Sequence, residues 1–422
     1  MWLETLLIGA ILIAPTIQYR LEFGAFSVAL FEPIVLVGLL LLVVRRLARG
    51  NLYRLKLHLP MVFVLLLIVW AALILPFSAN WQRNLSDLRD WLIPLLCYLL
   101  LGISTRQNWR RWVNLMLIWA TLTALLGLYQ QFTDSARFFI NPLADYKTGF
   151  VTAGSDAAAL QLVSYGVGLF SHPNIYGLYL LSSLLVLGGL VLHHRRHTAL
   201  ILLWLLIAFA FYGSYAKTAY LAALLSLVLM AAFWRFRKPE NLLFFGAILI
   251  FAAVFAIVIA VQILPTAVWN TFWWRVNLWQ IALQLLQSNP QILLWGNGMN
   301  QFGKIAFYGQ PHNLYVYITL AYGLPGLLLL LASFGAIFFE GWRMYRQQLF
   351  AIEPRLLGLW FALLTYFAIG LLESSLLGIE LRALFLTTLI LWESLSREVR
   401  ATLRVSPVPI ENLSAPVNVH AA

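Results

Sequence analysis

The residues best suited to chemistry lie between Arg275 and Gly326, where a polar and aromatic stretch interrupts an otherwise apolar chain. This stretch contains Pro311-His312-Asn313. A histidine at a membrane surface can be neutral near pH 7 and accept a proton from a hydroxyl group, so His312 is a candidate base. Arg275 could bind a phosphate through two N–H groups at once. The simpler alternatives are a histidine hydrogen-bonded to a loop and an arginine that anchors lipid headgroups.

Three further charged residues stand out because of their apolar surroundings. Lys217 begins a predicted helix beside apolar membrane, and its charge needs a partner, either a lipid phosphate or a carboxylate such as Glu373. Glu32 and Glu393 fall within apolar segments, where ionisable residues are costly and often functional. Glu32 could face a cavity, whereas Glu393 could simply reach the water at the end of its helix.

No sequence motif indicates a metal site or a nucleotide-binding fold. The chain has no P-loop, no GxGxxG after a strand, no Asp-x-Asp, no HExxH and no GxSxG. Gly296-Asn297-Gly298 is only a weak turn signal. We therefore expect a protein without a metal or a cofactor.

The composition indicates which elements must position these side chains. The 422 residues are 62% hydrophobic and 10% charged, whereas a soluble domain carries about 25% charged residues. Apolar stretches of about 20 residues recur, which predicts an all-α, polytopic membrane protein. The net charge of +12 does not indicate nucleic acid, because Lys and Arg cluster in short loops between apolar segments. The single cysteine, Cys97, excludes an intramolecular disulfide.

We predict about twelve transmembrane helices within one membrane domain, residues 1–404, followed by a disordered cytoplasmic tail, 405–422. The predicted spans are 5–18, 26–44, 60–76, 91–103, 112–131, 174–192, 198–213, 216–233, 241–264, 312–338, 356–372 and 383–396. Most of the 28 Lys and Arg fall in alternate loops, which predicts that both termini face the cytoplasm.

This orientation places two large loops, 132–173 and 265–311, on the outer face. Loops of this length are commonly functional. Within the second loop, Asn277, Gln280, Gln284 and Gln287 form one polar stripe at helical spacing. The stripe predicts an interfacial helix that follows an aromatic run and ends at Asn289-Pro290.

Together these residues resemble the signature region of the O-antigen ligase and O-antigen polymerase family. The resemblance extends over about 160–395, with a second family feature at 214–223 and a third at 168–174. Its ordered elements are Arg275, Trp279, Asn289-Pro290, Gly296-Asn297-Gly298, Phe302, His312-Asn313-Leu314-Tyr315 and Tyr322-Gly323-Leu324-Pro325-Gly326. The chain departs from the family at one point, because Lys217, preceded by Ala216, stands where the family has the Arg of a Ser-Arg pair.

The resemblance implies a membrane glycosyltransferase-like helical bundle in the bacterial plasma (inner) membrane, with its active site on the outer face. Such enzymes move a glycan from an undecaprenyl-diphosphate carrier to an acceptor hydroxyl, with inversion and without a metal. The acceptor is a glycan or a glycolipid. His312 would then be the base and Arg275 and Lys217 would bind phosphate. Asn313, Arg137 and Arg382 would be further substrate-binding candidates.

Two other classes of function fit the sequence. A polytopic transporter of a small anion or a glycan-related solute is compatible with twelve spans and with Glu32 inside the membrane. A transporter, however, usually places polar residues at the bilayer midplane in matching halves, and the polar residues here collect at one surface. A glycan-binding or assembly scaffold without catalysis would fit if Lys217 marks a degenerate site. The sequence leaves ligase and polymerase both open.

Overall fold

The computed structural model describes most of the helical chain. The described residues are 8–10, 12–16, 20–23, 26–29, 31–48, 57–77, 81–104, 109–133, 149–152, 160–163, 168, 170, 173–194, 197–214, 216–236, 266–298, 311–373, 376 and 379–405. The predicted span 241–264 and the predicted tail, from 406 onward, lie outside this set, and the last helix continues through residue 405.

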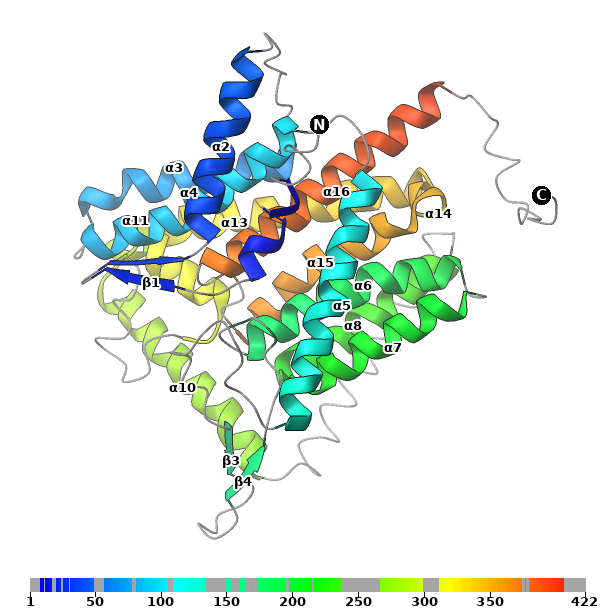
Figure 1. Ribbon diagram of the computed structural model, residues 1–422. Coiled ribbons are helices and arrows are strands. Elements are labelled where there is room, and N and C mark those ends of the chain that lie inside the picture. The colour runs from blue at the N-terminus through cyan, green and yellow to red at the C-terminus, as the bar shows by residue number, and fades with distance from the viewer. Residues whose placement is uncertain are drawn as a thin grey trace, which may run out of the picture.

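Long helices dominate the described part of the chain, as the apolar runs predict (Figure 1). They are α2 (Phe31–Ala48), α3 (Leu59–Leu73), α4 (Trp81–Ser104), α5 (Trp109–Thr133), α6 (Pro173–His193), α7 (Thr198–Tyr212), α8 (Lys217–Arg235), α10 (Thr266–Ser288), α13 (Leu314–Arg346), α15 (Pro354–Gly370) and α16 (Ile379–Val405). The shorter helices are η1 (Ala14–Thr16), η2 (Leu75–Phe77), α11 (Gln291–Trp295) and α14 (Leu349–Ile352).

Two short antiparallel hairpins depart from the all-α prediction. One pairs β1 (Arg20–Phe23) with β2 (Phe26–Ala29), and the other pairs β3 (Gly149–Thr152) with β4 (Leu160–Val163). The prediction that a span begins at residue 26 is therefore wrong, because α2 begins at Phe31. The reason is local, since polar and apolar residues alternate along β1, which favours a strand over a helix, and β2 pairs with it.

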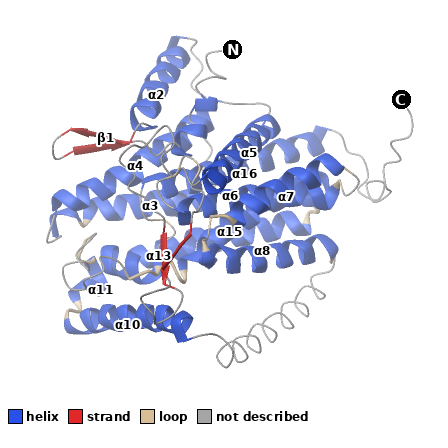
Figure 2. Ribbon diagram, turned by 60° about the horizontal axis from the view of Figure 1, so that its bottom comes forward, coloured by secondary structure: helices blue, strands red, loops and turns tan. Residues whose placement is uncertain are grey.

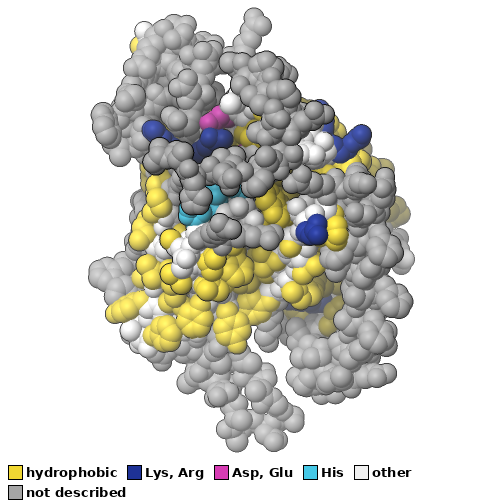
Figure 3. Space-filling view, turned by 90° about the vertical axis from the view of Figure 1, so that its right-hand side faces the viewer, with side chains coloured by type: hydrophobic (Ala, Val, Ile, Leu, Met, Phe, Trp, Pro, Cys, Tyr) yellow, Lys and Arg dark blue, Asp and Glu magenta, His cyan; other side chains and the backbone are white. Residues whose placement is uncertain are grey.

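The described helices include several that could cross a membrane. Four are long and apolar enough, within Trp109–Thr133, Asn174–His193, Thr218–Arg235 and Leu314–Arg346. The described apolar helices that are shorter are Leu59–Leu73, Thr198–Tyr212 and Pro354–Gly370. A helical membrane protein is thus confirmed, while the count of twelve spans stays a prediction. Figure 3 shows a face on which apolar side chains cover a broad area and Lys, Arg and His lie along its upper part.

Helix α6 forms the centre of the bundle. Its span is 83% buried, more than that of any other long apolar helix in the described residues. It packs against α7, α8 and above all α15 (Figures 1 and 2). Glycines permit the closest approach, since a Cβ at Gly189 would meet the carbonyl oxygen of Pro354 and one at Gly358 would meet that of Leu185. Small residues of this kind let membrane helices approach backbone to backbone.

Helix α10 lies at the edge of the helical body in both ribbon views (Figures 1 and 2). A small separate core ties it to the bundle, made by Leu278, Ala282 and Leu286 of α10 with Ile292 of α11 and Leu320 of α13. The helix predicted before Asn289-Pro290 is confirmed as a helix that ends at Ser288. It begins earlier than predicted, at Thr266, and includes the aromatic run.

Helix α13 is broken at Gly323, where φ is +70°. The break and Pro325 leave three successive carbonyl groups without helical partners, and residues from elsewhere bind them. The backbone N–H of Asn297 donates to Leu320 O at 2.7 Å and that of Gly298 donates to Ala321 O at 3.3 Å. The third carbonyl, that of Tyr322, accepts a 2.7 Å hydrogen bond from Nε1 of Trp70 in α3. We call this arrangement the carbonyl clamp.

Glycines are required where the clamp closes. Gly296 and Gly298 have φ of +73° and +82°, and a Cβ at Gly296 would collide with the carbonyl oxygen of Ala321. A Cβ at Gly323 would likewise meet Leu294 O at 2.5 Å. Gly296-Asn297-Gly298, a weak turn signal in the sequence, is therefore the segment that completes the hydrogen bonding of the broken helix.

The two intramembrane glutamates are both buried. Glu32 lies 3.7 Å from the Nε of Arg89, so it forms an ion pair. Glu393 is 1% exposed and accepts a hydrogen bond from the hydroxyl group of Tyr98. The expectation that Glu393 reaches water is wrong, because its helix packs this position against α4.

Candidate active site

Four parts of the chain meet around one carboxylate. Helix α10 supplies Arg275, the turn before α13 supplies His312, the turn after α15 supplies Glu373, and the first turn of α8 supplies Thr218. These segments are far apart in the sequence, so the cluster exists only in the folded protein. It brings together the two strongest candidates of the sequence analysis, Arg275 and His312.

Glu373 bridges Arg275 and His312 with its two oxygens. Nη2 of Arg275 donates to Oε1 at 2.5 Å, and Nδ1 of His312 lies 3.0 Å from Oε2. The Oγ1 of Thr218 lies 3.5 Å from Oε1, which is a weak contact. The side chains of Arg275, Glu373 and His312 are 17%, 16% and 30% exposed, so the cluster is partly shielded yet can be reached from outside.

The position of His312 is fixed by its neighbours on both sides. Its φ of +47° lies in the left-handed region, which is uncommon for a residue other than glycine. Trp279 Nε1 donates to the carbonyl of Pro311 at 2.8 Å, and the ring of Trp274 lies 5.2 Å from the imidazole. Asn313 caps α13 by accepting from Val316 N at 3.0 Å. The imidazole is therefore held against Glu373 from two helices.

The contact with Glu373 determines what His312 can do. A carboxylate accepts the proton on Nδ1, which leaves Nε2 with a free lone pair. No described residue provides a hydrogen-bond partner for Nε2. Since the second nitrogen is available and the ring is 30% exposed, His312 is arranged to accept a proton from a bound molecule.

Arg275 has donor capacity beyond its bond to Glu373. Its Nε is buried and has no hydrogen-bond partner among the described residues. Because a buried N–H without a partner is costly, this atom points to an acceptor that binds there, either water or a ligand. A guanidinium group can offer two parallel N–H groups to a phosphate.

Lys217 lies at the first position of α8, directly before Thr218. The structure describes its backbone but not its side chain. No side chain caps this helix at Ala216, so the first turn of α8 presents backbone N–H groups near the cluster. Ser214, just before, is fully buried, and its hydroxyl group donates to Phe211 O at 2.6 Å. It therefore shapes the turn rather than offering a surface group.

Of the remaining candidates, Asn313 lies beside the cluster and Arg382 lies in another environment. Asn313 donates to the carbonyl of Leu371 at 2.8 Å in addition to capping α13, so its amide ties the His312 turn to the Glu373 turn. Arg382 is completely buried, forms a 2.6 Å ion pair with Asp87 and stacks over Trp91. This placement favours a role in stability. Arg137 lies outside the described residues.

Sequence reasoning missed the central role of Glu373. The residue was considered only as a possible partner of Lys217, because its neighbours in the sequence are apolar or small. A carboxylate between the predicted spans 356–372 and 383–396 is the one available signal. Within the described part of the chain, no group of three or more His, Cys, Asp or Glu could hold a metal ion.

A comparison with known families covers part of this cluster. Residues 201–331 match the O-antigen ligase family model. The resemblance seen in the sequence is therefore confirmed over this stretch. The matched stretch contains Lys217, Arg275 and His312, whereas Glu373 lies beyond it. A comparison with curated proteins gives no match.

An O-antigen ligase domain supports glycan transfer of the ligase or polymerase type in a bacterial inner membrane. It implies a lipid-linked glycan and an acceptor as partners, which agrees with the membrane-spanning helices. It lends no support to the transporter alternative.

Proposed function

We propose that this protein transfers a glycan from an undecaprenyl-diphosphate carrier to an acceptor hydroxyl on the outer face of the inner membrane. The observation that carries the proposal is the position of Glu373 between His312 and Arg275. The cluster is partly shielded, and it joins a histidine that can accept a proton and an arginine that can bind a phosphate. Both are needed for this reaction.

His312 acts as the base. Glu373 holds the proton on Nδ1, so Nε2 faces the acceptor hydroxyl and takes its proton as the oxygen attacks the anomeric carbon of the donor. The positive charge that develops on the imidazole lies 3.0 Å from the Glu373 carboxylate, which stabilises it. Glu373 is thus a positioning residue and does not take the proton itself.

Arg275 and Lys217 stabilise the leaving group. As the new glycosidic bond forms, the bond between the anomeric carbon and the diphosphate oxygen breaks, and the carrier diphosphate gains one negative charge. The free N–H groups of Arg275, the ammonium of Lys217 and the uncapped first turn of α8 are the groups that can bind this charge. Basic side chains that carry out this task make a metal ion unnecessary.

The base acts on the bond that forms, between the acceptor oxygen and the anomeric carbon. The phosphate-binding groups act on the bond that breaks, between the anomeric carbon and the diphosphate oxygen. An acceptor activated by His312 attacks the face of the sugar opposite the diphosphate, so the anomeric configuration inverts. A ligase and a polymerase share this chemistry and differ in the acceptor, which is a glycolipid for the first and another glycan chain for the second.

The test is glycan transfer by His312→Ala in proteoliposomes that contain lipid-linked glycan and either type of acceptor. Loss of a general base removes about 10²–10⁴-fold of the rate, so we expect turnover to fall by at least 100-fold with unchanged membrane insertion. His197→Ala is the matched control, because His197 is exposed at the start of α7, away from the cluster. Turnover of His312→Ala close to that of the control would exclude His312 as the base.

A further inference from the structure

A cavity of about 510 Å³ lies between α3, α13 and α16, far from the candidate active site. Glu340 in its wall is 26 positions along α13 from Leu314, the residue that follows the His312 turn. At 1.5 Å per residue this separation corresponds to roughly 40 Å, about the thickness of a bilayer. The cavity therefore belongs to the opposite end of α13 from the His312 turn.

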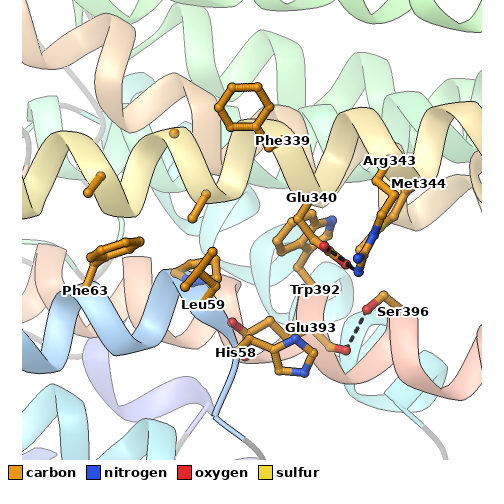
Figure 4. Close-up of a pocket in the computed structure, with 14 residues that line it drawn as sticks. His58, Leu59, Phe63, Phe339, Glu340, Arg343, Met344, Trp392, Glu393 and Ser396 are labelled. Carbon is orange, nitrogen blue, oxygen red and sulfur yellow. Dashed lines mark hydrogen bonds and ion pairs between the residues drawn. The ribbon is translucent and has the colours of Figure 1, made fainter.

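One side of the cavity is apolar and open to the surroundings. Figure 4 shows Leu59 and Phe63 at one end and the charged residues at the other, with Phe339 above. Leu59 and Phe339 are 60% and 70% exposed, so lipid chains would contact them in a membrane. Gly335 leaves space in the wall, because no atom lies within 4 Å of where a Cβ would sit. An acyl chain fits these surroundings.

The other end of the cavity is rich in positive charge. Glu340 is paired with Arg343 at 2.6 Å and with Arg400 at 2.7 Å. Burial lowers the pKa of His58 to about 4, and the nearby Arg397, Arg400 and Arg343 contribute while Glu340 alone opposes them. Against these three cations stand two carboxyl groups at the same end, those of Glu340 and Glu393, and Glu393 accepts a hydrogen bond from Tyr98. His58 itself is neutral at physiological pH. The excess charge is suited to a negatively charged headgroup.

Two buried donors at this end have no acceptor among the described residues. Trp392 lines the cavity and is completely buried, and its Nε1–H makes no hydrogen bond there. The Nε of Arg400 is also buried without a partner. Because an unsatisfied buried donor is costly, an acceptor oxygen from a bound molecule would stabilise both groups.

We propose that this cavity binds an anionic membrane phospholipid, with its phosphate at the Arg343, Arg400 and Trp392 end and an acyl chain along Leu59 and Phe339. In the predicted orientation this end of α13 faces the cytoplasm, where basic pockets between helices bind anionic headgroups. The lipid-linked donor is a poorer occupant, because its diphosphate must lie at the other end of α13 and its apolar tail has no group for these cations.

The test is native mass spectrometry of the purified protein with dioleoyl phosphatidylglycerol or dioleoyl phosphatidylcholine. We expect one phosphatidylglycerol to be retained in preference to phosphatidylcholine. Arg343→Gln should weaken phosphatidylglycerol binding about fivefold and affect phosphatidylcholine little, since one basic residue near a headgroup contributes about this much. Gly335→Leu should abolish binding of both lipids by filling the cavity, without strain in α13.

Arg346→Gln is the matched control, because it removes one exposed charge from the same helix end outside the cavity. The proposal is wrong if Gly335→Leu, verified as folded by thermal melting, binds phosphatidylglycerol as the unmodified protein does. It is also wrong if the two lipids bind equally and Arg343→Gln behaves as Arg346→Gln does. The proposal is wrong, too, if the purified protein retains no lipid at all, as it would if another segment of the chain filled the cavity.

Discussion

Glu373→Gln is the most informative substitution, because it keeps the shape of the side chain and changes only charge and donor pattern. Arg275 can only donate hydrogen bonds, so the amide oxygen of the new side chain must face Nη2 of Arg275. The amide nitrogen then faces Nδ1 of His312 and donates to it. The imidazole proton must then lie on Nε2. In the proposed reaction, Nε2 is the atom that takes the proton from the hydroxyl group of the acceptor sugar.

The expected effect follows from this change of tautomer. An imidazole protonated on Nε2 cannot act as the base, so the full contribution of general base catalysis, about 10²–10⁴-fold, is lost. This corresponds to about 3–5 kcal/mol in the activation free energy. The donor KM should change little, because Arg275 keeps an oxygen partner. Glu373→Asp keeps the charge and should retain part of the activity at a longer distance from His312.

The assay measures kcat and donor KM separately in proteoliposomes, with thermal melting of the same preparations. Glu353→Gln is the matched control, because Glu353 also bridges two arginines, Arg110 at 2.6 Å and Arg355 at 2.8 Å, but at the other end of α15. It should lower stability and leave turnover unchanged below the melting temperature. The reasoning fails if Glu373→Gln turns over as the unmodified protein does, or if Glu353→Gln is equally impaired.

Three further predictions concern the leaving group. Arg275→Ala should lower kcat/KM for the lipid-linked donor about 10²–10³-fold. Arg275→Lys should lower it less, because Lys keeps the charge without the paired N–H groups. An unchanged kcat/KM in Arg275→Ala would show that Arg275 does not belong to the site. Lys217→Ala should lose at least tenfold in turnover with little change in melting temperature. Lys217→Arg should match or exceed the turnover of the unmodified protein. If Lys217→Ala instead loses stability and keeps its turnover, Lys217 forms a structural ion pair. Transfer should persist in excess EDTA, measured with and without added Mg²⁺ or Mn²⁺, and inactivation reversed by either ion would contradict a metal-free reaction.

Hydropathy alone predicts much of the helical framework. The predicted spans 174–192, 198–213, 216–233 and 356–372 agree with α6, α7, α8 and α15 to within a few residues. These helices are continuous apolar runs between polar loops, so composition and length define their limits. The same reasoning places the start of α13 correctly, because His312 and Asn313 precede an apolar run and Asn313 caps it.

Where the prediction fails, tertiary contacts determine the structure. The span predicted at 91–103 is part of α4, which begins ten residues earlier, at Trp81. Its first turns contain Asp87 and other polar residues that hydropathy assigns to a loop. Asp87 is nevertheless buried, because Arg382 of α16 lies opposite it in the fold. A pair of residues 295 positions apart leaves no trace in local composition.

The sequence predicts some residues of the candidate site and misses others. His312 and Arg275 stand out in the sequence because each has a distinct chemistry and lies in a polar and aromatic stretch that interrupts an apolar chain. Glu373 does not stand out, because its importance lies in being the one described carboxylate that both residues reach. A contact between one helix and two turns that are distant in the sequence can be seen only in the folded structure.

The carbonyl clamp has a consequence for the order in which the protein assembles. All three of its donors, at residues 70, 297 and 298, precede the carbonyls of 320–322 in the chain, so each donor has been synthesised before the broken helix needs it. The charges of the cluster follow the opposite order, since Glu373 comes 61 residues after His312 and 98 residues after Arg275. A nascent chain can thus form the hydrogen bonds of the carbonyl clamp first. Arg275 gains its partner Glu373 only after the end of α15 has been synthesised.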